Sequence, residues 1–287
     1  MAAPPLACTV RGCGLGLESR GRAWACPRGH SYDVARSGYV NLLQPQDRKA
    51  RAPGDKPAAV AARSSLLAAG VGRALIDDVV RRVRTLGLPD EAVVVDLGSG
   101  SGDALGAVAA AHPIVGVGID LSAAAAEHAA RRFPLLTWVV ANADRRLPLV
   151  DGSVDLVLSL HARRNPAECA RVLSPSGLLI VAVPAADDLI ELRTIVLGGG
   201  AEHDRVPSLV SEHAPFFELR DRSTVRERQR LDRPALLALL GATYRGARTS
   251  AARRVEALTV LDVTVAADVC VFGPGVDGDR PSEKAVP

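Results

Sequence analysis

The feature that most constrains this chain is the stretch Ala92-Val-Val-Val-Asp-Leu-Gly-Ser-Gly-Ser-Gly-Asp103. Its apolar, mostly β-branched first half predicts a buried strand of a parallel sheet, and residues 104–111 behind it favour a helix. The glycines between the two let the backbone turn sharply and approach a ligand closely. The start of the helix offers free main-chain N–H groups to an electron-rich ligand. The stretch therefore predicts a strand, a ligand-binding turn and a helix of an α/β fold.

A second apolar strand, expected at 113–120, ends in Asp120, 24 residues after Asp96. A carboxylate at that spacing suits the hydroxyls of a ribose. The spacing alone also fits a nicotinamide-dependent dehydrogenase, and a glycine-rich turn without a ligand is a further alternative. The turn Asp96-Leu-Gly-Ser-Gly100 carries an acid inside the strand, and in this it resembles the S-adenosylmethionine (AdoMet) loop of class I methyltransferases. That resemblance implies a Rossmann-like, seven-stranded α/β domain.

Candidate cofactor ligands lie in this turn and at the ends of the next two strands. We expect the turn to bind the methionine part of AdoMet through Asp96, Gly98, Gly100, Ser101 and Gly102. Asp120 is then the ribose ligand. Asp144 is the candidate adenine ligand, because class I methyltransferases place such a residue after the third strand. Asp144 can equally be a turn-capping residue.

The N-terminal region contains a potential metal site. Cys8, Cys13, Cys26 and His30 form the pattern Cys-x4-Cys-x12-Cys-x3-His. Thiolate and imidazole ligands suit tetrahedral zinc, and four protein ligands leave no open position, so the zinc is expected to be structural. A short hairpin at about 15–25 would bring the two ligand pairs together. The alternative is an N-terminal tail with free thiols. Cys169 and Cys270 lie in apolar contexts and are expected to be buried core thiols.

A more specific resemblance begins at the second ligand pair. The block Cys26-Pro-x-x-His-Ser-Tyr-Asp-x-Ala-x-x-Gly-Tyr-Val-Asn-Leu-Leu43 resembles the signature that follows the zinc site in the 23S rRNA guanine-N1 methyltransferases. The resemblance continues through Pro53-Gly-Asp55, Ala62-Arg63, 145–148, 164–166 and 170–175. It implies methyl transfer from AdoMet to N1 of a guanine in a 23S rRNA hairpin at the peptide exit tunnel. Relatives from macrolide producers confer resistance to macrolides such as tylosin, and family members are expected to dimerise.

At three site positions the chain departs from the family pattern. Gly72 stands where the family usually has a tyrosine that touches AdoMet. Asp188 replaces a histidine that is expected near the cofactor, so it inherits a cofactor-binding position without the residue type. His161 lies with Arg163 in the loop where we look for the methyl acceptor. It is the candidate catalytic residue that helps to remove the N1 proton of guanine, although it can also simply cap the strand.

The domain organisation follows from these motifs. We expect a zinc-binding module at 1–43, a basic linker at 44–56, an AdoMet-dependent methyltransferase domain at 57–272 and a disordered tail at 273–287. A helical pattern over 57–86 is interrupted by Gly70-Val-Gly72. A strand expected at 216–231 carries arginines at alternate positions. These arginines could meet RNA phosphate, as could the basic linker, or form a solvated face paired with Glu218, Asp221 and Glu227.

Composition narrows the class of protein further. No run of 18 apolar residues and no basic-then-apolar N-terminal segment is present, which argues against a membrane span or secretion and indicates a cytoplasmic location. The net charge of +3 is mild.

Two other functional classes stay open. A small-molecule methyltransferase would share the AdoMet core but has little use for a zinc module. A non-catalytic AdoMet- or RNA-binding protein would explain the departures at Gly72, His161, Arg163 and Asp188.

Overall fold

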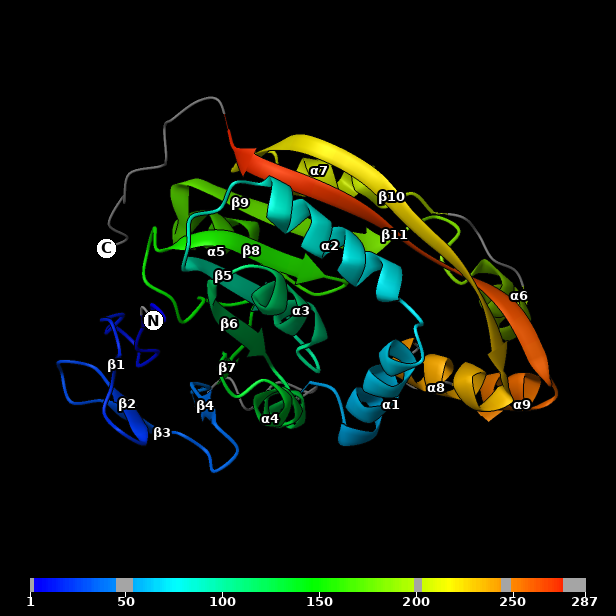
Figure 1. Cartoon of the computed structure of the whole chain (residues 1–287), viewed down its shortest axis with the longest axis horizontal. Helices are drawn as coiled ribbons and strands as arrows, with labels where there is room; N and C mark the ends of the chain where they lie inside the picture. The colour runs from blue at the N-terminus through cyan, green and yellow to red at the C-terminus, as the bar shows by residue number, and fades with distance from the viewer. Residues whose placement is uncertain (1–2, 45–53, 199–202, 244–248, 276–287) are drawn as a thin grey trace.

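The computed structural model describes residues 3–44, 54–198, 203–243 and 249–275 (Figure 1). In chain order its elements are β1 (Glu18–Ser19), β2 (Ala23–Ala25), β3 (Ser31–Asp33), β4 (Tyr39–Asn41), α1 (Pro57–Ala68), α2 (Arg73–Thr85), β5 (Ala92–Leu97), α3 (Asp103–Ala111), β6 (Ile114–Asp120), α4 (Ala123–Arg132), β7 (Thr137–Val140), β8 (Val154–Leu160), α5 (Pro166–Val172), β9 (Leu173–Pro184), α6 (Ile190–Leu197), α7 (Val206–His213), β10 (Phe217–Asp232), α8 (Arg233–Thr243), α9 (Thr249–Glu256) and β11 (Val260–Pro274).

One large sheet organises the described chain, with strand order β10-β11-β9-β8-β5-β6-β7-β4. Strands β9, β8, β5, β6 and β7 are parallel, whereas β11 runs antiparallel between β9 and β10. Seven of these strands have the class I methyltransferase order, which confirms the predicted fold class. The eighth strand, β4, comes from the segment predicted as the zinc module and pairs in parallel with β7. It covers main-chain groups that would otherwise lie at an open sheet edge.

Both faces of the sheet are buried, as expected for parallel strands. Val94 of β5 packs in one apolar cluster with residues of α2, α3 and α4. Val95 and Leu97 of the same strand point to the other face, where they pack in a cluster with residues of α5, α7 and the N-terminal module. In Figure 1, α2 and α3 lie in front of the sheet, and α5 and α7 lie behind it. The zinc module therefore shares a core with the methyltransferase domain.

The long β10–β11 hairpin extends past the carboxyl ends of the parallel strands (Figure 1). Its distal part packs against α1, α6, α8 and α9 in a third apolar cluster, which includes Leu66, Leu192, Leu231, Leu239 and Val263. These helices form a layer of their own near the edge of the sheet at which class I enzymes bind their ligands.

Helices α1 and α2 meet at the predicted break, Gly70-Val71-Gly72. Gly72 has a φ of 82°, in the left-handed region that favours glycine. Within the described part of the chain, no single helix is long and apolar enough to cross a membrane. Only α1 and α2 taken together pass that test of length and composition, and they are bent by 75°.

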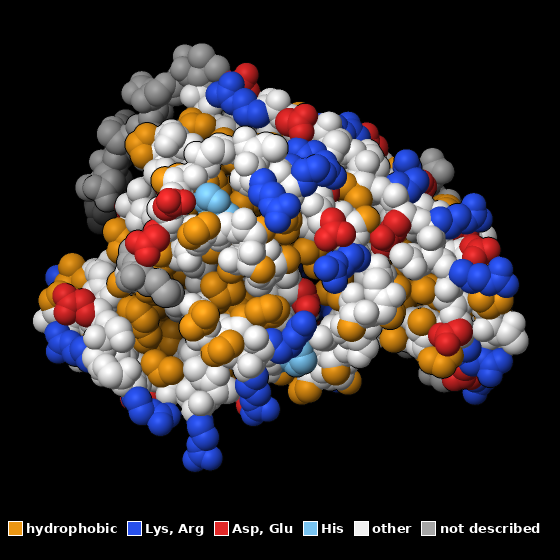
Figure 2. Space-filling view, viewed as in Figure 1, with side chains coloured by type: hydrophobic (Ala, Val, Ile, Leu, Met, Phe, Trp, Pro, Cys, Tyr) orange, Lys and Arg blue, Asp and Glu red, His pale blue; other side chains and the backbone are white. Residues whose placement is uncertain are grey.

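The arginines of β10 are exposed at alternate positions from Arg222 onward, but their ion pairs differ from the predicted ones. Arg226 pairs with Asp187 at 2.8 Å and Arg222 with Asp204 at 3.5 Å. Of the three predicted acids, only Glu218 pairs with an arginine of this strand, Arg220, at 3.0 Å. The other two acids are held elsewhere: Asp221 by Arg82 of α2, and Glu227 by the N–H group of Gly72. Figure 2 shows basic side chains spread over this side of the molecule and mixed with acidic ones.

Candidate active site and zinc centre

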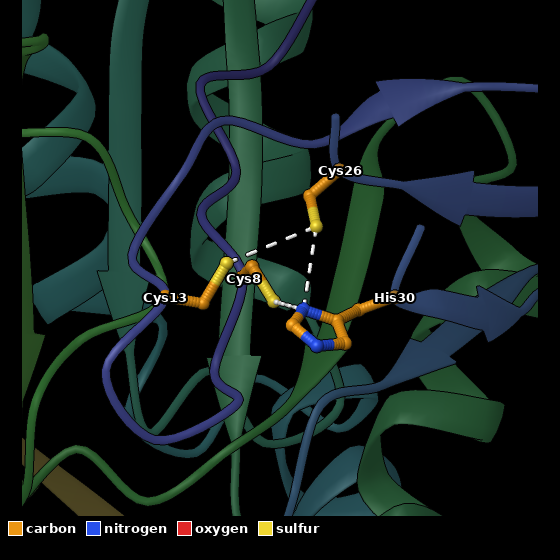
Figure 3. A group of neighbouring side chains, drawn as sticks. All are labelled: Cys8, Cys13, Cys26 and His30. Carbon is orange, nitrogen blue, oxygen red and sulfur yellow. Dashed lines mark hydrogen bonds between the residues drawn. The ribbon is translucent and has the colours of Figure 1, made fainter. Parts of the chain in front are cut away.

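Three cysteines and a histidine converge in the N-terminal module (Figure 3). Cys8 and Cys13 lie ahead of β1, and Cys26 and His30 lie between β2 and β3. The four ligand atoms all lie within 4.8 Å of one another. His30 Nδ1 is 3.4 Å from the Sγ atoms of both Cys8 and Cys26, and the Sγ atoms of Cys13 and Cys26 are 3.8 Å apart.

These distances fit the edges of a zinc tetrahedron. Bonds of about 2.3 Å to sulfur and about 2.05 Å to nitrogen place two sulfurs about 3.8 Å apart, and sulfur and nitrogen about 3.5 Å apart. Four protein ligands complete the coordination, so the zinc is structural, as predicted. The remaining cysteines, Cys169 and Cys270, are fully buried core thiols, also as predicted.

Neighbouring groups contact the cysteine ligands, and those around Cys26 favour its thiolate form. The Tyr32 hydroxyl lies 3.2 Å from Cys8 Sγ and accepts a hydrogen bond from the Thr9 N–H. Burial raises the pKa of Cys26, but hydrogen bonds from main-chain groups of His30 and Arg28 and from the neighbouring thiols outweigh it and bring the pKa to about 7. A thiol with that pKa readily supplies the thiolate that binds zinc.

The turn between β5 and α3 is packed tightly against its neighbours. Gly98, Gly100 and Gly102 have φ values of 69°, 54° and 81°. A Cβ on Gly98 would lie 2.5 Å from Cβ of Ala162, and one on Gly102 would lie 2.5 Å from the Trp138 ring. Glycine is therefore required at both positions for steric reasons as well as for backbone conformation. Ser101 Oγ donates to Asp103 Oδ2 at 2.5 Å.

Two acids lie beside this turn. Asp120 accepts hydrogen bonds from the N–H groups of Gly100 at 2.9 Å and Ser122 at 2.7 Å, one at each oxygen, and keeps further lone pairs for a ligand. Asp96 is 2% exposed and has no hydrogen-bond donor among the described residues. Burial and the negative charge of Asp120 raise its pKa to about 8. A buried carboxylate without a partner is unfavourable, and a cationic ligand group would compensate it. The ammonium of the methionine part of AdoMet is such a group.

Comparisons with known proteins agree with this arrangement. A methyltransferase-domain family matches residues 94–177, and the zinc ribbon described as RlmA, N-terminal, matches residues 7–51. A protein of Micromonospora griseorubida assigned as a 23S rRNA (guanine-N(1)-)-methyltransferase is 38% identical, over 93% of this chain and 95% of its own length. The 23S rRNA (guanine(748)-N(1))-methyltransferase of Streptomyces fradiae is 35% identical, over 91% of this chain and 95% of its own length. The chain belongs to the 23S rRNA (guanine-N1)-methyltransferase family.

Solved structures that resemble this family member are more distant. The AdoMet-dependent methyltransferase of Geobacter sulfurreducens, in complex with S-adenosyl-L-homocysteine, is 17% identical with a TM-score of 0.46, over 69% of this chain and 91% of that one. The corresponding complex from Thiobacillus denitrificans is 18% identical with a TM-score of 0.46 and the same coverage. At these scores no residue of this methyltransferase takes a role from them.

In this methyltransferase the loop after β7 holds Asp144, the predicted adenine ligand. Its N–H donates to Asn142 Oδ1 at 3.0 Å, so the side chain that caps this turn is that of Asn142. Its carboxylate pairs with Arg163, from the loop after β8, at 3.2 Å, and both side chains are exposed. The ion pair thus joins two loops at the carboxyl ends of the strands. The adenine contact of Asp144 stays a prediction.

His161 begins the loop after β8 with a φ of 55°, which is unusual for a residue other than glycine. Its N–H is held by the carbonyl oxygen of Ala182 at 2.9 Å. Burial, and then the positive charges of Arg205 and Arg63, lower the pKa of His161 to about 4. The residue as a whole is exposed, and its ring is neutral at pH 7. A base with so low a pKa accepts a proton poorly, so the low pKa argues against His161 as the base. The catalytic role of His161 stays a prediction.

Two other predicted cofactor residues make contacts within the fold. Asp188 Oδ1 accepts a hydrogen bond from Ala266 N at 3.0 Å, just where β9 stops pairing with β11. Burial raises the pKa of Asp188 to about 6. The N–H of Gly72 donates to Glu227 Oε1 at 2.5 Å. These hydrogen bonds give Asp188 and Gly72 a structural role. Contact of either residue with AdoMet stays a prediction.

The structure also draws attention to two residues to which the sequence assigned no role. Asp55 and Arg63 form an ion pair of 2.5 Å beside the residues that follow Asp120. Their only signal in the sequence was their presence in two of the blocks that carry the family resemblance.

Proposed function

We propose that this protein transfers the methyl group of AdoMet to N1 of a guanine in 23S rRNA. One observation carries the proposal: a zinc ribbon and an AdoMet-type glycine turn occur together in a chain that aligns over more than nine-tenths of its length with 23S rRNA (guanine-N1)-methyltransferases. A metabolite methyltransferase would share the turn but has little use for the ribbon.

Methyl transfer depends more on the alignment of the reacting atoms than on strong acids or bases. AdoMet, when bound, supplies a methyl group activated by its sulfonium. Guanine N1 bonds to the methyl carbon as the carbon–sulfur bond breaks, and the N1 proton leaves to solvent or to a nearby base. Asp96 and Asp120 would fix the cofactor so that the methyl group faces the loop after β8. Because N1 is hidden in a base pair, the target guanine must be unpaired or extruded.

Arginine side chains are suited to hold the RNA. Arg228 and Arg230 are exposed on β10 and have no ion pair within 4 Å in the described part of the chain, so we propose that they contact phosphate. Residues 45–53, which make up most of the basic segment predicted to contact RNA, lie outside the described residues.

The family resemblance supports a more specific proposal. The target lies in the hairpin at the peptide exit tunnel, methylation there protects the ribosome from macrolides such as tylosin, and the enzyme acts as a homodimer in the cytoplasm. Drug susceptibility of a sensitive bacterium that expresses the protein tests the resistance, and light scattering of the purified protein tests the dimer.

Transfer itself is tested with labelled AdoMet and unmodified 23S rRNA, with the Asp96→Ala variant as control. The wild type is expected to label the RNA and the variant is not. If the wild type binds AdoMet but leaves 23S rRNA unlabelled, the proposal is wrong, and a metabolite methyltransferase or a non-catalytic relative replaces it.

A further inference from the structure

Residues 54–56, which lead into α1, pass directly over the chain that follows Asp120. Gly54, with a φ of 83°, is so close that a Cβ there would lie 2.6 Å from the Ser122 nitrogen. Ser122 is buried, and its Oγ donates to the carbonyl oxygen of Asp55 at 2.7 Å. Because Ser122 N also donates to Asp120, the segment is fixed to the same turn that orients this acid.

The ion pair between Asp55 and Arg63 connects this segment to α1. One guanidinium nitrogen of Arg63 donates to Asp55 Oδ2 at 2.5 Å, and the other donates to the carbonyl oxygen of Ala242 at 3.1 Å. These two hydrogen bonds come from different parts of the chain and fix the plane of the guanidinium. They use two of its five N–H donors, and 38% of the side chain is exposed. Arg63 is thus oriented but can still bind a further anion.

The charge of Arg63 acts on two residues of the candidate site. Burial raises the pKa of Asp120. The hydrogen bonds from the Ser122 and Gly100 N–H groups and the charge of Arg63 oppose this shift, whereas the charge of Asp55 adds to it. Burial, Arg205 and Arg63 lower the pKa of His161. The second cation, Arg205, donates to the Pro184 carbonyl oxygen and acts on His161 and Asp188. Arg63 therefore acts on both the predicted ribose ligand and the loop for the methyl acceptor, whereas Arg205 acts on that loop and on Asp188.

We propose that Arg63 binds the carboxylate of the methionine part of AdoMet, and that Asp55 holds the guanidinium in position. The proposal rests on the AdoMet dependence of the proposed function. The amino-acid end of AdoMet carries an ammonium and a carboxylate. Asp96 has no hydrogen-bond donor in the part of the chain that the structure describes and is complementary to the ammonium. Arg63 offers the planar set of N–H groups that binds a carboxylate best.

Two ligands that differ in one group test this assignment. Decarboxylated AdoMet keeps the adenosine, the sulfonium and the amine but lacks the carboxylate. Calorimetry would measure the binding of both ligands to the wild type and to Arg63→Ala, Arg63→Lys and Asp55→Asn, without RNA. Arg73→Ala is the matched control, because Arg73 is an exposed arginine of α2 that pairs with Asp77 on its own helix.

Arg63→Ala is expected to weaken AdoMet binding about 10- to 100-fold, as for the loss of a charged hydrogen-bonded contact, and to change binding of decarboxylated AdoMet less than about twofold. Arg63→Lys and Asp55→Asn should give smaller losses for AdoMet alone, and Arg73→Ala should change neither. Equal losses for both ligands, or unchanged AdoMet binding in a folded Arg63→Ala protein, overturn the assignment. If Arg63→Ala weakens the binding of AdoMet alone but the wild type does not methylate RNA, only the proposed substrate is wrong.

Discussion

The main-chain N–H of Ala7 donates a hydrogen bond to the carbonyl oxygen of Pro148 at 2.9 Å, next to the zinc ligand Cys8. On the same side, Val150 N donates to Pro5 O at 3.0 Å. At the other end of the intervening loop, Leu42 N donates to Val140 O at 3.0 Å. The zinc ribbon thus holds both ends of the loop 141–147, which contains the predicted adenine ligand Asp144.

Removing zinc should therefore affect cofactor binding at a distance. Without the metal the ribbon loses its main constraint, and the loop 141–147 loses its anchors. After chelation, we expect faster amide hydrogen exchange in 141–150 and roughly tenfold weaker binding of S-adenosylhomocysteine, both reversed by added zinc. Unchanged exchange and affinity in a protein shown by metal analysis to contain no zinc would refute this coupling.

Tyr32→Phe should weaken zinc binding without unfolding the module. The variant removes the hydroxyl beside Cys8 Sγ and leaves the four ligands in place. Loss of such a supporting contact typically lowers metal affinity by about 10-fold or more. Competition with a chromogenic chelator measures the change. An affinity equal to that of the wild type would show that the hydroxyl does not support the metal site.

The buried acid Asp96 should make stability depend on pH. Its pKa rises from 3.8 to about 8 on folding, so between these values only the folded chain keeps the proton. The ligand-free protein should lose stability as pH rises through this window and change little above it. Asp96→Asn should remove this part of the dependence and be about 1 to 3 kcal/mol more stable at pH 9, because no unpaired charge is buried.

The same variant should bind AdoMet more weakly, because the amide cannot neutralise the ammonium. Thermal unfolding at a series of pH values, together with calorimetry, separates the two effects. An Asp96→Asn protein that is less stable than the wild type at pH 9 would contradict this view of Asp96.

His161 should not titrate near neutral pH during methyl transfer. The low pKa keeps its ring neutral from pH 5.5 to 8. Asn tolerates a positive φ, so His161→Asn should preserve the backbone. The single-turnover rate of the variant should follow the same pH profile as the wild type over this range. A wild-type inflection near pH 6.5 that is absent from the variant would instead identify His161 as the base.

The sequence predicted the parts of the fold that depend on local pattern. The turn after Asp96, the strand that ends in Asp120, the break at Gly70–Gly72 and the four zinc ligands all depend on residue types at short spacing. The structure has each of these elements within a few residues of the expected place. The candidate cofactor residues Asp96 and Asp120 lie at the ends of adjacent strands because successive βα units place them there.

The parts that were missed depend on contacts between distant segments. Nothing within Tyr39–Asn41 indicates that it pairs with β7 about a hundred residues later. Arg222 and Arg226 of β10 pair with acids of other elements, so spacing along the strand found Glu218 but pointed wrongly to Asp221 and Glu227. The helices α7, α8 and α9 were not predicted either. A role for the ion pair of Asp55 and Arg63 could not be predicted, because it depends on the contact between residues 54–55 and Ser122.

The most direct test of the account is to map the methyl group on 23S rRNA treated with this protein and AdoMet. A methyl group on N1 blocks base pairing, so primer extension should stop at one guanine, and nucleoside analysis should show 1-methylguanosine there. Asp96→Ala should give no stop. A methyl group on another atom or base, or full-length extension in the presence of a wild-type protein that binds AdoMet, would contradict the account.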